Sequence, residues 1–171
     1  MGKNKYQSVR EDELKWSREK AVDILAETTY TDKNGKTTQF NYLNYDKLVK
    51  LEHDPEKFQP LDVLGLSIVY NKPELRNHYC CHDCEIGKID TPIVEDASNI
   101  HKILVNMVVS LDSVNSQKLR LMQILEDGVV DDKEVDDLNE ILEELEKISM
   151  TVEAIQLWCE KMKIVIDKKQ I

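Results

Sequence analysis

Residues 44–54 read NYDKLVKLEHD, a stretch with the pattern of a short helix that has one apolar side and one basic side. Asn44 belongs to the residue types that cap helices, because its side chain accepts a hydrogen bond from the first turn. Residues three apart share one side of a helix. The apolar pair and the basic pair therefore point in different directions: Leu48 and Leu51, and Lys47 and Lys50. So short a helix is stable only within a bundle that buries its leucines.

The sequence around this stretch predicts the rest of such a bundle. Upstream, residues 17–26 read SREKAVDILA, with Ser17 as the cap and an apolar stripe of Ala21, Ile24 and Leu25. Helical signals also cover residues 5–13 and 61–70. Gly65 lies inside the last of these helices and costs about 1 kcal/mol against alanine there, so close packing must hold it.

Residues 28–42 interrupt the helices with Thr- and Tyr-containing segments on either side of Asn34-Gly35. An Asn-Gly pair between β-forming residues is a strong hairpin signal, because both residues tolerate the left-handed backbone of a tight turn. We therefore expect an inserted, exposed β-hairpin that carries Lys33 and Lys36 at its turn.

The C-terminal half predicts two long amphipathic helices, from about residue 97 to 126 and from about residue 134 to 167. Asp127-Gly128 breaks the first helix, and Asp131 or Asp132 caps the second, which together predict an antiparallel helical hairpin. The second helix has two apolar stripes, the first with coiled-coil spacing: Val135, Leu138, Leu142 and Leu145, and Ile141, Ile148, Ile155 and Met162. Two helices cannot bury so broad a face, so we expect it to pack on the N-terminal unit or on a second copy.

Composition excludes several classes of protein. The 171 residues are 41% hydrophobic but only 6% aromatic, with five Gly and four Pro, which disfavours β-rich, collagen-like and largely disordered chains. No apolar run approaches the roughly 20 residues of a membrane span, and the first residues lack the apolar stretch of a secretory signal. We therefore expect a cytoplasmic chain without membrane contacts.

Charge is distributed unevenly along the chain. The net charge is −10, and residues 95–171 contain nine Lys or Arg against 17 Asp or Glu. The first 60 residues balance 11 basic against 11 acidic residues. A neutral N-terminal part can approach a polyanion, whereas the acidic C-terminal half repels one.

Several stretches, in this order, resemble the Xre/Cro-type helix-turn-helix family of transcriptional regulators. Residues 16–25 (WSREKAVDIL) are similar to the second helix of the family, residues 44–54 to its recognition helix and residues 59–70 to the next helix. The stretch Tyr79-Cys-Cys-His-Asp-Cys-Glu-Ile-Gly87 resembles the Tyr-Cys-x-x-x-Cys-x-Ile-Gly connector of a Firmicutes subgroup with a C-terminal helical pair. The resemblance spans most of the chain.

The resemblance implies an all-α fold in which a helix-turn-helix bundle with an inserted β-hairpin is followed by a long antiparallel helical hairpin. The expected parts are the bundle with its insertion, a Cys- and His-containing connector, and the acidic hairpin: residues 1–75 with the insertion at 28–42, residues 76–94, and residues 95–171.

The resemblance also implies an operator-binding regulator that works as a homodimer on a pseudo-palindromic site, with the helical hairpin giving dimerisation or effector contact. The DNA-binding residues that it implies are Ser17, Arg18, Lys33, Lys36, Tyr45, Lys47 and Lys50. The first two would meet phosphate at a helix N-terminus, and those after residue 44 would face the major groove. Arg10 and Glu52 would form an internal ion pair.

Two features depart from the family pattern. Residues 27–43 stand where a turn of about four residues is usual, so the hairpin either acts as a basic wing or blocks the groove. The neutral N-terminal part also limits non-specific affinity for DNA. The alternative is a protein-interaction module without DNA affinity, which captures a basic protein with the acidic helical pair, as a phage-type inhibitor or antirepressor does.

Nothing in the sequence indicates catalysis, because Gly-rich phosphate loops, Gly-x-Ser-x-Gly and His-Glu-x-x-His are absent. We expect a non-enzyme with no catalytic residues, no cofactor and no metal. One cluster of zinc-ligand residue types falls within seven residues: His78, Cys80, Cys81, His82 and Cys84. Reduced thiols with a packing role are the favoured interpretation, and a zinc site completed by a distant group such as Cys159 is the alternative.

Overall fold

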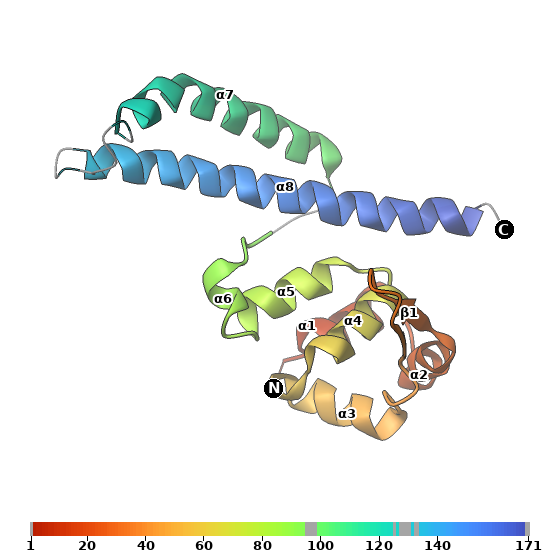
Figure 1. Ribbon diagram of the computed structural model, residues 1–171. Coiled ribbons are helices and arrows are strands. Elements are labelled where there is room, and N and C mark those ends of the chain that lie inside the picture. Colours follow the sequence, from red (N-terminus) through yellow and green to blue (C-terminus); the bar gives the residue numbers. More distant parts are fainter. Residues whose placement is uncertain (1, 95–98, 125, 127–130, 132–133, 170–171) are drawn as a thin grey trace. The chain divides into compact units, whose positions relative to one another are not determined.

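The computed structural model describes residues 2–94, 99–124, 126, 131 and 134–169. It divides into two compact units, unit 1 (Met1–Thr91) and unit 2 (Pro92–Ile171), shown in Figure 1. The described residues are mostly helical with one small two-stranded sheet, which confirms the predicted fold class. Among them, no helix combines the length and apolarity that crossing a membrane requires.

Unit 1 is built from short helices and one hairpin. Its elements, in chain order, are α1 (Lys5–Ser8), the π-helical turn η1 (Val9–Glu13), α2 (Arg18–Glu27), β1 (Thr29–Thr31), β2 (Thr37–Gln39), α3 (Tyr45–His53), the 3₁₀ turn η2 (Pro55–Lys57), α4 (Pro60–Val69), α5 (Glu74–His82) and α6 (Gly87–Asp90). The predicted helices before residue 70 agree with these bounds to within a residue or so.

Polar side chains at the start of each helix explain these bounds. Asn4, Ser17 and Asn44 cap α1, α2 and α3, and the side chain of each accepts a hydrogen bond from the backbone N–H three residues later. At the start of α4, the carboxylate of Asp62 accepts a hydrogen bond from the Gln59 N–H at 3.1 Å. Asn71 follows α4 with a φ of 52°, the left-handed conformation that ends helices.

The core of unit 1 is aliphatic and aromatic, and it draws on every helix from α1 to α5 and on the loop after the hairpin. Its buried members are Tyr6, Val9, Ala21, Leu25, Phe40, Leu43, Leu48, Leu51, Phe58, Val63, Leu66, Val69, Tyr70 and Leu75. Leu48 and Leu51 are both buried, as predicted. The ring of Phe40 lies against Gly65, where an added Cβ would come within 2.7 Å of it. The predicted close packing around Gly65 is therefore confirmed.

The predicted β-hairpin is present. β1 and β2 pair antiparallel with Thr29 opposite Gln39 and Thr31 opposite Thr37. The Asp32 carboxylate organises the turn, because it accepts hydrogen bonds from the N–H groups of residues 34 and 36 at 2.8 and 2.9 Å. Gly35 adopts a φ of 80°, which explains the glycine there.

The prediction of a connector over residues 76–94 is wrong. Most of that segment forms α5 and α6, which belong to unit 1, so the boundary lies between Thr91 and Pro92. Leu75 is fully buried, and the Tyr6 hydroxyl donates a hydrogen bond to Asp83 at 2.9 Å. Long-range contacts of this kind cannot be derived from local patterns, which is why the segment resembled a linker.

Unit 2 contains α7 (Ile100–Ile124) and α8 (Val135–Lys169), which pack side by side and antiparallel (Figure 1). Asp131 caps α8, since its carboxylate accepts from the Glu134 N–H and the Glu134 carboxylate accepts from the Asp131 N–H. The predicted break at Asp127-Gly128 and the predicted start near residue 97 lie outside the described residues.

The second apolar stripe of α8, not the coiled-coil stripe, is directed toward α7. Ile141 is 1% exposed, whereas Val135 and Leu142 on the coiled-coil stripe are 42% and 51% exposed. Arg120 of α7 pairs with Asp137 of α8 and donates to it at 2.6 Å through Nε. Two helices thus leave a broad apolar face uncovered, as the sequence predicts.

Candidate nucleic-acid interface

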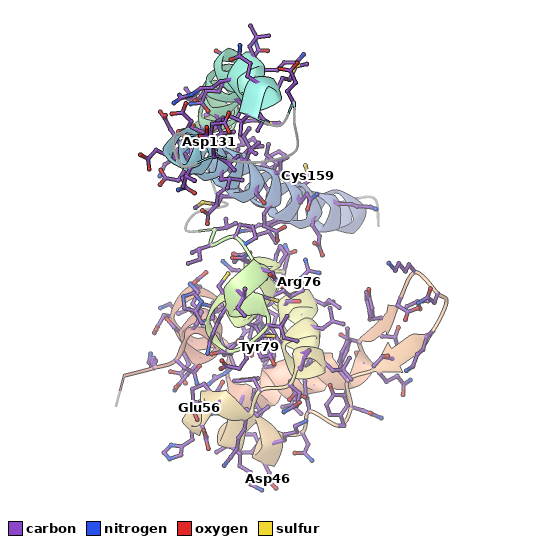
Figure 2. All side chains as sticks on the ribbon, turned by 60° about the vertical axis from the view of Figure 1, so that its left-hand side comes forward. Asp46, Glu56, Arg76, Tyr79, Asp131 and Cys159 are labelled. Carbon is purple, nitrogen blue, oxygen red and sulfur yellow. The ribbon has the colours of Figure 1, made fainter. Side chains whose placement is uncertain are left out.

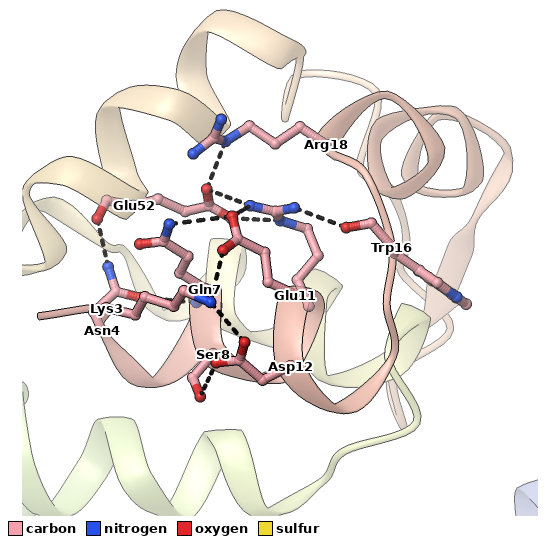
Figure 3. Close-up of polar contacts among 10 residues, drawn as sticks. Lys3, Asn4, Gln7, Ser8, Glu11, Asp12, Trp16, Arg18 and Glu52 are labelled. Carbon is pink, nitrogen blue, oxygen red and sulfur yellow. Dashed lines mark hydrogen bonds and ion pairs between the residues drawn. The ribbon is translucent and has the colours of Figure 1, made fainter.

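A buried ion pair fixes α3 against the N-terminal helices (Figure 3). Arg10 donates from Nε and a terminal nitrogen to the two carboxylate oxygens of Glu52, at 2.6 and 2.8 Å. Both side chains are 2% exposed. A third hydrogen bond, at 2.8 Å, joins Arg10 to the Trp16 carbonyl. The predicted ion pair between Arg10 and Glu52 is confirmed, and its two-point geometry sets the orientation of α3.

Arg18 belongs to the same network, which corrects its predicted role at a phosphate. Its Nε donates to Glu52 at 2.6 Å, and the side chain is only partly exposed. The carboxylate of Glu52 therefore balances two guanidinium groups. Ser17 is exposed and caps α2 as predicted, with its hydroxyl accepting from the Lys20 N–H at 3.2 Å.

Lys47 also has a partner within unit 1, so it does not extend freely from α3 as predicted. Its Nζ donates to Asp62 at 2.8 Å and lies 4.5 Å from the centre of the Tyr42 ring. Asp62 is 1% exposed. Burial and the nearby Asp62 carboxylate raise the pKa of Tyr42 to about 12. This cluster positions α3 against the start of α4.

Four of the predicted DNA-binding side chains lie exposed with no ion pair to another described residue. Tyr45 and Lys50 are exposed on α3, and Lys33 and Lys36 are exposed at the turn of the hairpin. Both strands of the hairpin are themselves mostly exposed, and Figure 2 shows the hairpin extending from the helices of unit 1. The structure brings these residues into one unit that presents cationic and aromatic groups to solvent.

Acidic side chains share the outer surface of unit 1. Asp46, next to Tyr45, is exposed, and Figure 2 shows Asp46 and Glu56 at the periphery of the unit. The Asp54 carboxylate forms an exposed ion pair with Lys57 at 2.7 Å. Asp46 therefore weakens the attraction of the first turn of α3 for a phosphate backbone.

Sequence reasoning missed Asp62 as a partner of Lys47 and Glu52 as a partner of Arg18. Asp62 follows Pro60 by two residues at the start of an apolar helix, which indicates a capping acid. That signal is local, so it identifies the cap but not the lysine 15 residues earlier that binds the same carboxylate.

The Cys- and His-rich segment has a packing role. The Cys84 sulfur accepts a hydrogen bond from the Gly87 N–H at 3.4 Å, and the Cys81 thiol donates to Asn77 at 3.6 Å. A Cβ on Gly87 would come within 2.5 Å of the Cys80 carbonyl oxygen, so only glycine allows α6 to approach α5. Within the described part of the chain, no three His, Cys, Asp or Glu side chains are grouped to hold a metal ion.

His78 is half-buried between two aromatic rings. It stacks on His82 with 4.4 Å between centroids and meets Tyr6 edge-on at 5.9 Å. Burial, followed by the neighbouring His82, lowers the pKa of His78, although Asp83 acts in the opposite direction.

This shift makes unit 1 sensitive to mild acid. The pKa of His78 is lower in the folded state than in the unfolded state. Its contribution to the free energy of unfolding is therefore fully present above the unfolded-state pKa of about 6.5 and is lost as the pH falls through the folded-state pKa. We expect His78→Gln to reduce the loss of unfolding free energy between about pH 7.5 and pH 5.5, measured by urea denaturation. His101→Gln, at an exposed position in unit 2, is the matched control. An unchanged pH dependence in His78→Gln would contradict the prediction.

Comparison of the chain with protein-family models, with curated proteins and with solved structures gives no match.

Proposed function

We propose that the chain is a sequence-specific DNA-binding transcriptional regulator in which unit 1 meets the duplex. The observation that carries the proposal is the two-sidedness of α3. Its inner side is held by buried leucines and the Arg10–Glu52 pair, while Tyr45 and Lys50 are exposed on its outer side. A short, firmly seated helix with exposed cationic and aromatic groups is the element that helix-turn-helix proteins insert in the major groove.

The predicted DNA-binding residues fall into two groups, according to whether an ion pair within unit 1 already holds the side chain. Arg18 and Lys47 hold α3 in place through Glu52 and Asp62. Lys50 and Tyr45 contact base edges or phosphates, and Lys33 and Lys36 contact phosphates as a wing beside the helix. Ser17 caps the N-terminus of α2, where the positive end of the helix dipole attracts a phosphate. The regulator binds a pseudo-palindromic operator as a homodimer through unit 2.

Selection of genomic fragments by the full chain, at about 50 mM and about 200 mM salt, tests this proposal. We expect a defined set of fragments whose affinity falls at the higher salt. Lys50→Ala should weaken binding about tenfold and reduce the slope of log affinity against log salt by about one, because one phosphate or guanine contact is lost. Lys33→Ala with Lys36→Ala should reduce the slope further.

Lys88→Ala is the matched control, since Lys88 is an exposed lysine of unit 1 on α6 whose one ion pair within the described residues is with the exposed Glu85. Lys47 is unsuitable for this test because its removal leaves the buried Asp62 without a counter-charge. Equal weakening by Lys88→Ala and Lys50→Ala would contradict the assigned surface.

A protein-interaction module without DNA affinity is the second candidate. It is favoured by the neutralisation of Arg18 and Lys47 inside unit 1 and by the exposure of Asp46 and Glu56. Recovery of no defined fragment at either salt concentration would overturn DNA binding and support capture of a basic protein by this acidic surface or by α8.

A further inference from the structure

Unit 2 has an apolar face that neither of its helices covers and that Asn115 and Lys118 interrupt on α7. We name it the apolar face, and it comprises four side chains from each helix: Leu104, Val108, Leu111 and Met122 of α7, and Val135, Leu142, Leu145 and Val152 of α8. Each of these side chains is between 37% and 61% exposed. On α7 and on α8 the residues follow the three-and-four spacing of a coiled-coil seam.

The two stripes lie on the same side of the helical pair. On each helix the stripe follows the inner, α7–α8 contact residues by about one position, which rotates it by roughly 100° about the helix axis. In an antiparallel pair, equal rotations bring both stripes to one side. Residues one position before the inner contact residues should lie together on the opposite side of the pair. Four of them do, because Lys102, Asn106, Lys147 and Met150 line one shared cavity of about 350 Å³.

We infer that the apolar face binds a second copy of the chain, so that two helical pairs form a four-helix bundle. Burial of a Val, Leu or Met side chain removes roughly 60–120 Å² of apolar surface, so the eight half-exposed side chains offer about 350 Å² per copy. In a standard interface each partner contributes roughly 800 Å², of which somewhat more than half is apolar. The apolar face supplies a large part of that apolar area. Patches of this kind on soluble chains mark interaction sites.

Unit 1 offers no matching surface among its described residues. Its exposed large apolar side chains form no stripe of this length, although Ile86 and Ile89 lie three residues apart at α6. They are Tyr30, Tyr45, Leu61, Ile86 and Ile89. The apolar face runs for about 27 Å between the levels of Leu104 and Met122, at 1.5 Å per residue. A stripe of that length and spacing occurs in the described chain on α7 and α8 alone, so the surface that best fits the face is the face itself.

Charge selects how the two copies are stacked. The exposed edge of the stripe on α8 carries Glu146 and Glu153, whereas the same edge on α7 carries Val105, Leu119 and a single acid, Asp112, and Lys118 lies within the α7 stripe. Stacking α8 on α8 would oppose the glutamates of the two copies. Stacking α8 on α7 of the partner places them beside Val105, Leu119 and Lys118, with Asp112 as the one acid on that edge, so fewer like charges meet. The second arrangement has its two-fold axis along the helices.

This arrangement has a consequence for the whole chain. With the axis along the helices, both copies of α7 begin at the same end of the bundle, where the chain leads back to unit 1. With the axis across the helices, the two starting points would be separated by the length of α7, about 37 Å. Two copies of unit 1 attached at one end suit two half-sites on one duplex. The role of the dimer at two half-sites rests on the proposed function, whereas the interface itself is tested without DNA.

Sedimentation equilibrium of the full chain at micromolar concentrations tests the interface. Val108 and Val109 form a matched pair, since they are adjacent, chemically identical and 58% and 62% exposed, yet only Val108 belongs to the apolar face. We expect a dimer whose dissociation constant rises at least 100-fold with Val108→Glu and with Leu142→Glu. Val109→Glu, on the cavity side, should leave it within about threefold of the starting value.

Helix content by circular dichroism shows that each variant is folded, which exposed positions allow. A monomer at every concentration, or equal weakening by Val108→Glu and Val109→Glu, would overturn the proposed interface.

The stacking of α8 on α7 is tested by the distance between spin labels introduced through an unnatural amino acid at His101 in the two copies. A short distance is expected, and a separation near the length of α7 would overturn the stacking of α8 on α7. If the chain forms the dimer but selects no defined DNA fragments, the proposed DNA binding is contradicted and the proposed interface is not.

Discussion

Glu52→Gln is expected to destabilise unit 1 by about 3–5 kcal/mol, because it leaves the buried guanidinium of Arg10 without a counter-charge. The pair is 2% exposed on both sides, and the same carboxylate also accepts from Arg18. Glutamine retains the shape and one acceptor but neutralises the charge. The loss should appear as a lower midpoint of urea denaturation with little change in slope.

Trp16 provides the probe for this measurement, since it packs against the core of unit 1 and its ring meets Tyr70 at 6.0 Å. A Trp158→Phe background leaves Trp16 as the only tryptophan. Asp54→Asn is the control, because it breaks the exposed pair with Lys57 and should cost less than about 1 kcal/mol. A loss in Glu52→Gln no larger than in Asp54→Asn would show that the buried pair does not hold α3.

Replacement of Arg10 and Glu52 together tests whether the cost comes from an unpaired charge. We expect Arg10→Met with Glu52→Met to cost less than the sum of the two single changes, since no buried charge is left opposite an apolar group at that site. The residual cost arises from the Trp16 carbonyl and Arg18, which both lose a partner.

Gly65→Val is expected to destabilise unit 1 by about 3 kcal/mol through overpacking. The new Cβ would lie 2.7 Å from Cδ1 of Phe40, whose side chain is fully buried in the core of unit 1. Gly65→Ala should also be destabilising, by about 1 kcal/mol, although alanine has the higher helix propensity, because the gain of about 1 kcal/mol is smaller than the steric cost.

Phe40→Leu supplies the control for this prediction. In that background the ring is absent, so Gly65→Ala should become neutral or stabilising, and the two changes should be non-additive by at least 1 kcal/mol in urea denaturation. An equal cost of Gly65→Ala in both backgrounds would show that the ring of Phe40 is not what requires glycine.

Local signals in the sequence were sufficient for most of the elements. Ser17 and Asn44 mark helix starts because the capping hydrogen bond spans only three residues, and Leu48 and Leu51 mark the buried side because helical spacing is itself local. Gly35 marks the turn of the hairpin for the same reason. The pairing of Arg10 with Glu52 came from the family resemblance, since no local rule joins residues 42 positions apart.

The surface of the candidate site depended on contacts that a one-dimensional pattern does not contain. Lys47 and Lys50 are equivalent by spacing, yet the first is paired with the buried Asp62 and the second is exposed. Their difference arises because α4 starts beside the first turn of α3. The availability of a charged group is set by its neighbours in space, so sequence alone assigned both lysines to DNA.

The sequence by itself determined that this chain forms short capped helices, a hairpin and two long amphipathic helices, because hydrogen bonding and burial within an element repeat at short, fixed intervals. Only the tertiary structure decided that residues 74–90 complete unit 1 and that Ile141 rather than Leu142 is buried against α7. Those outcomes depend on which of two apolar sides meets a neighbouring helix. That choice is made by the packing of the whole unit, in which side chains far apart in sequence compete for the same space.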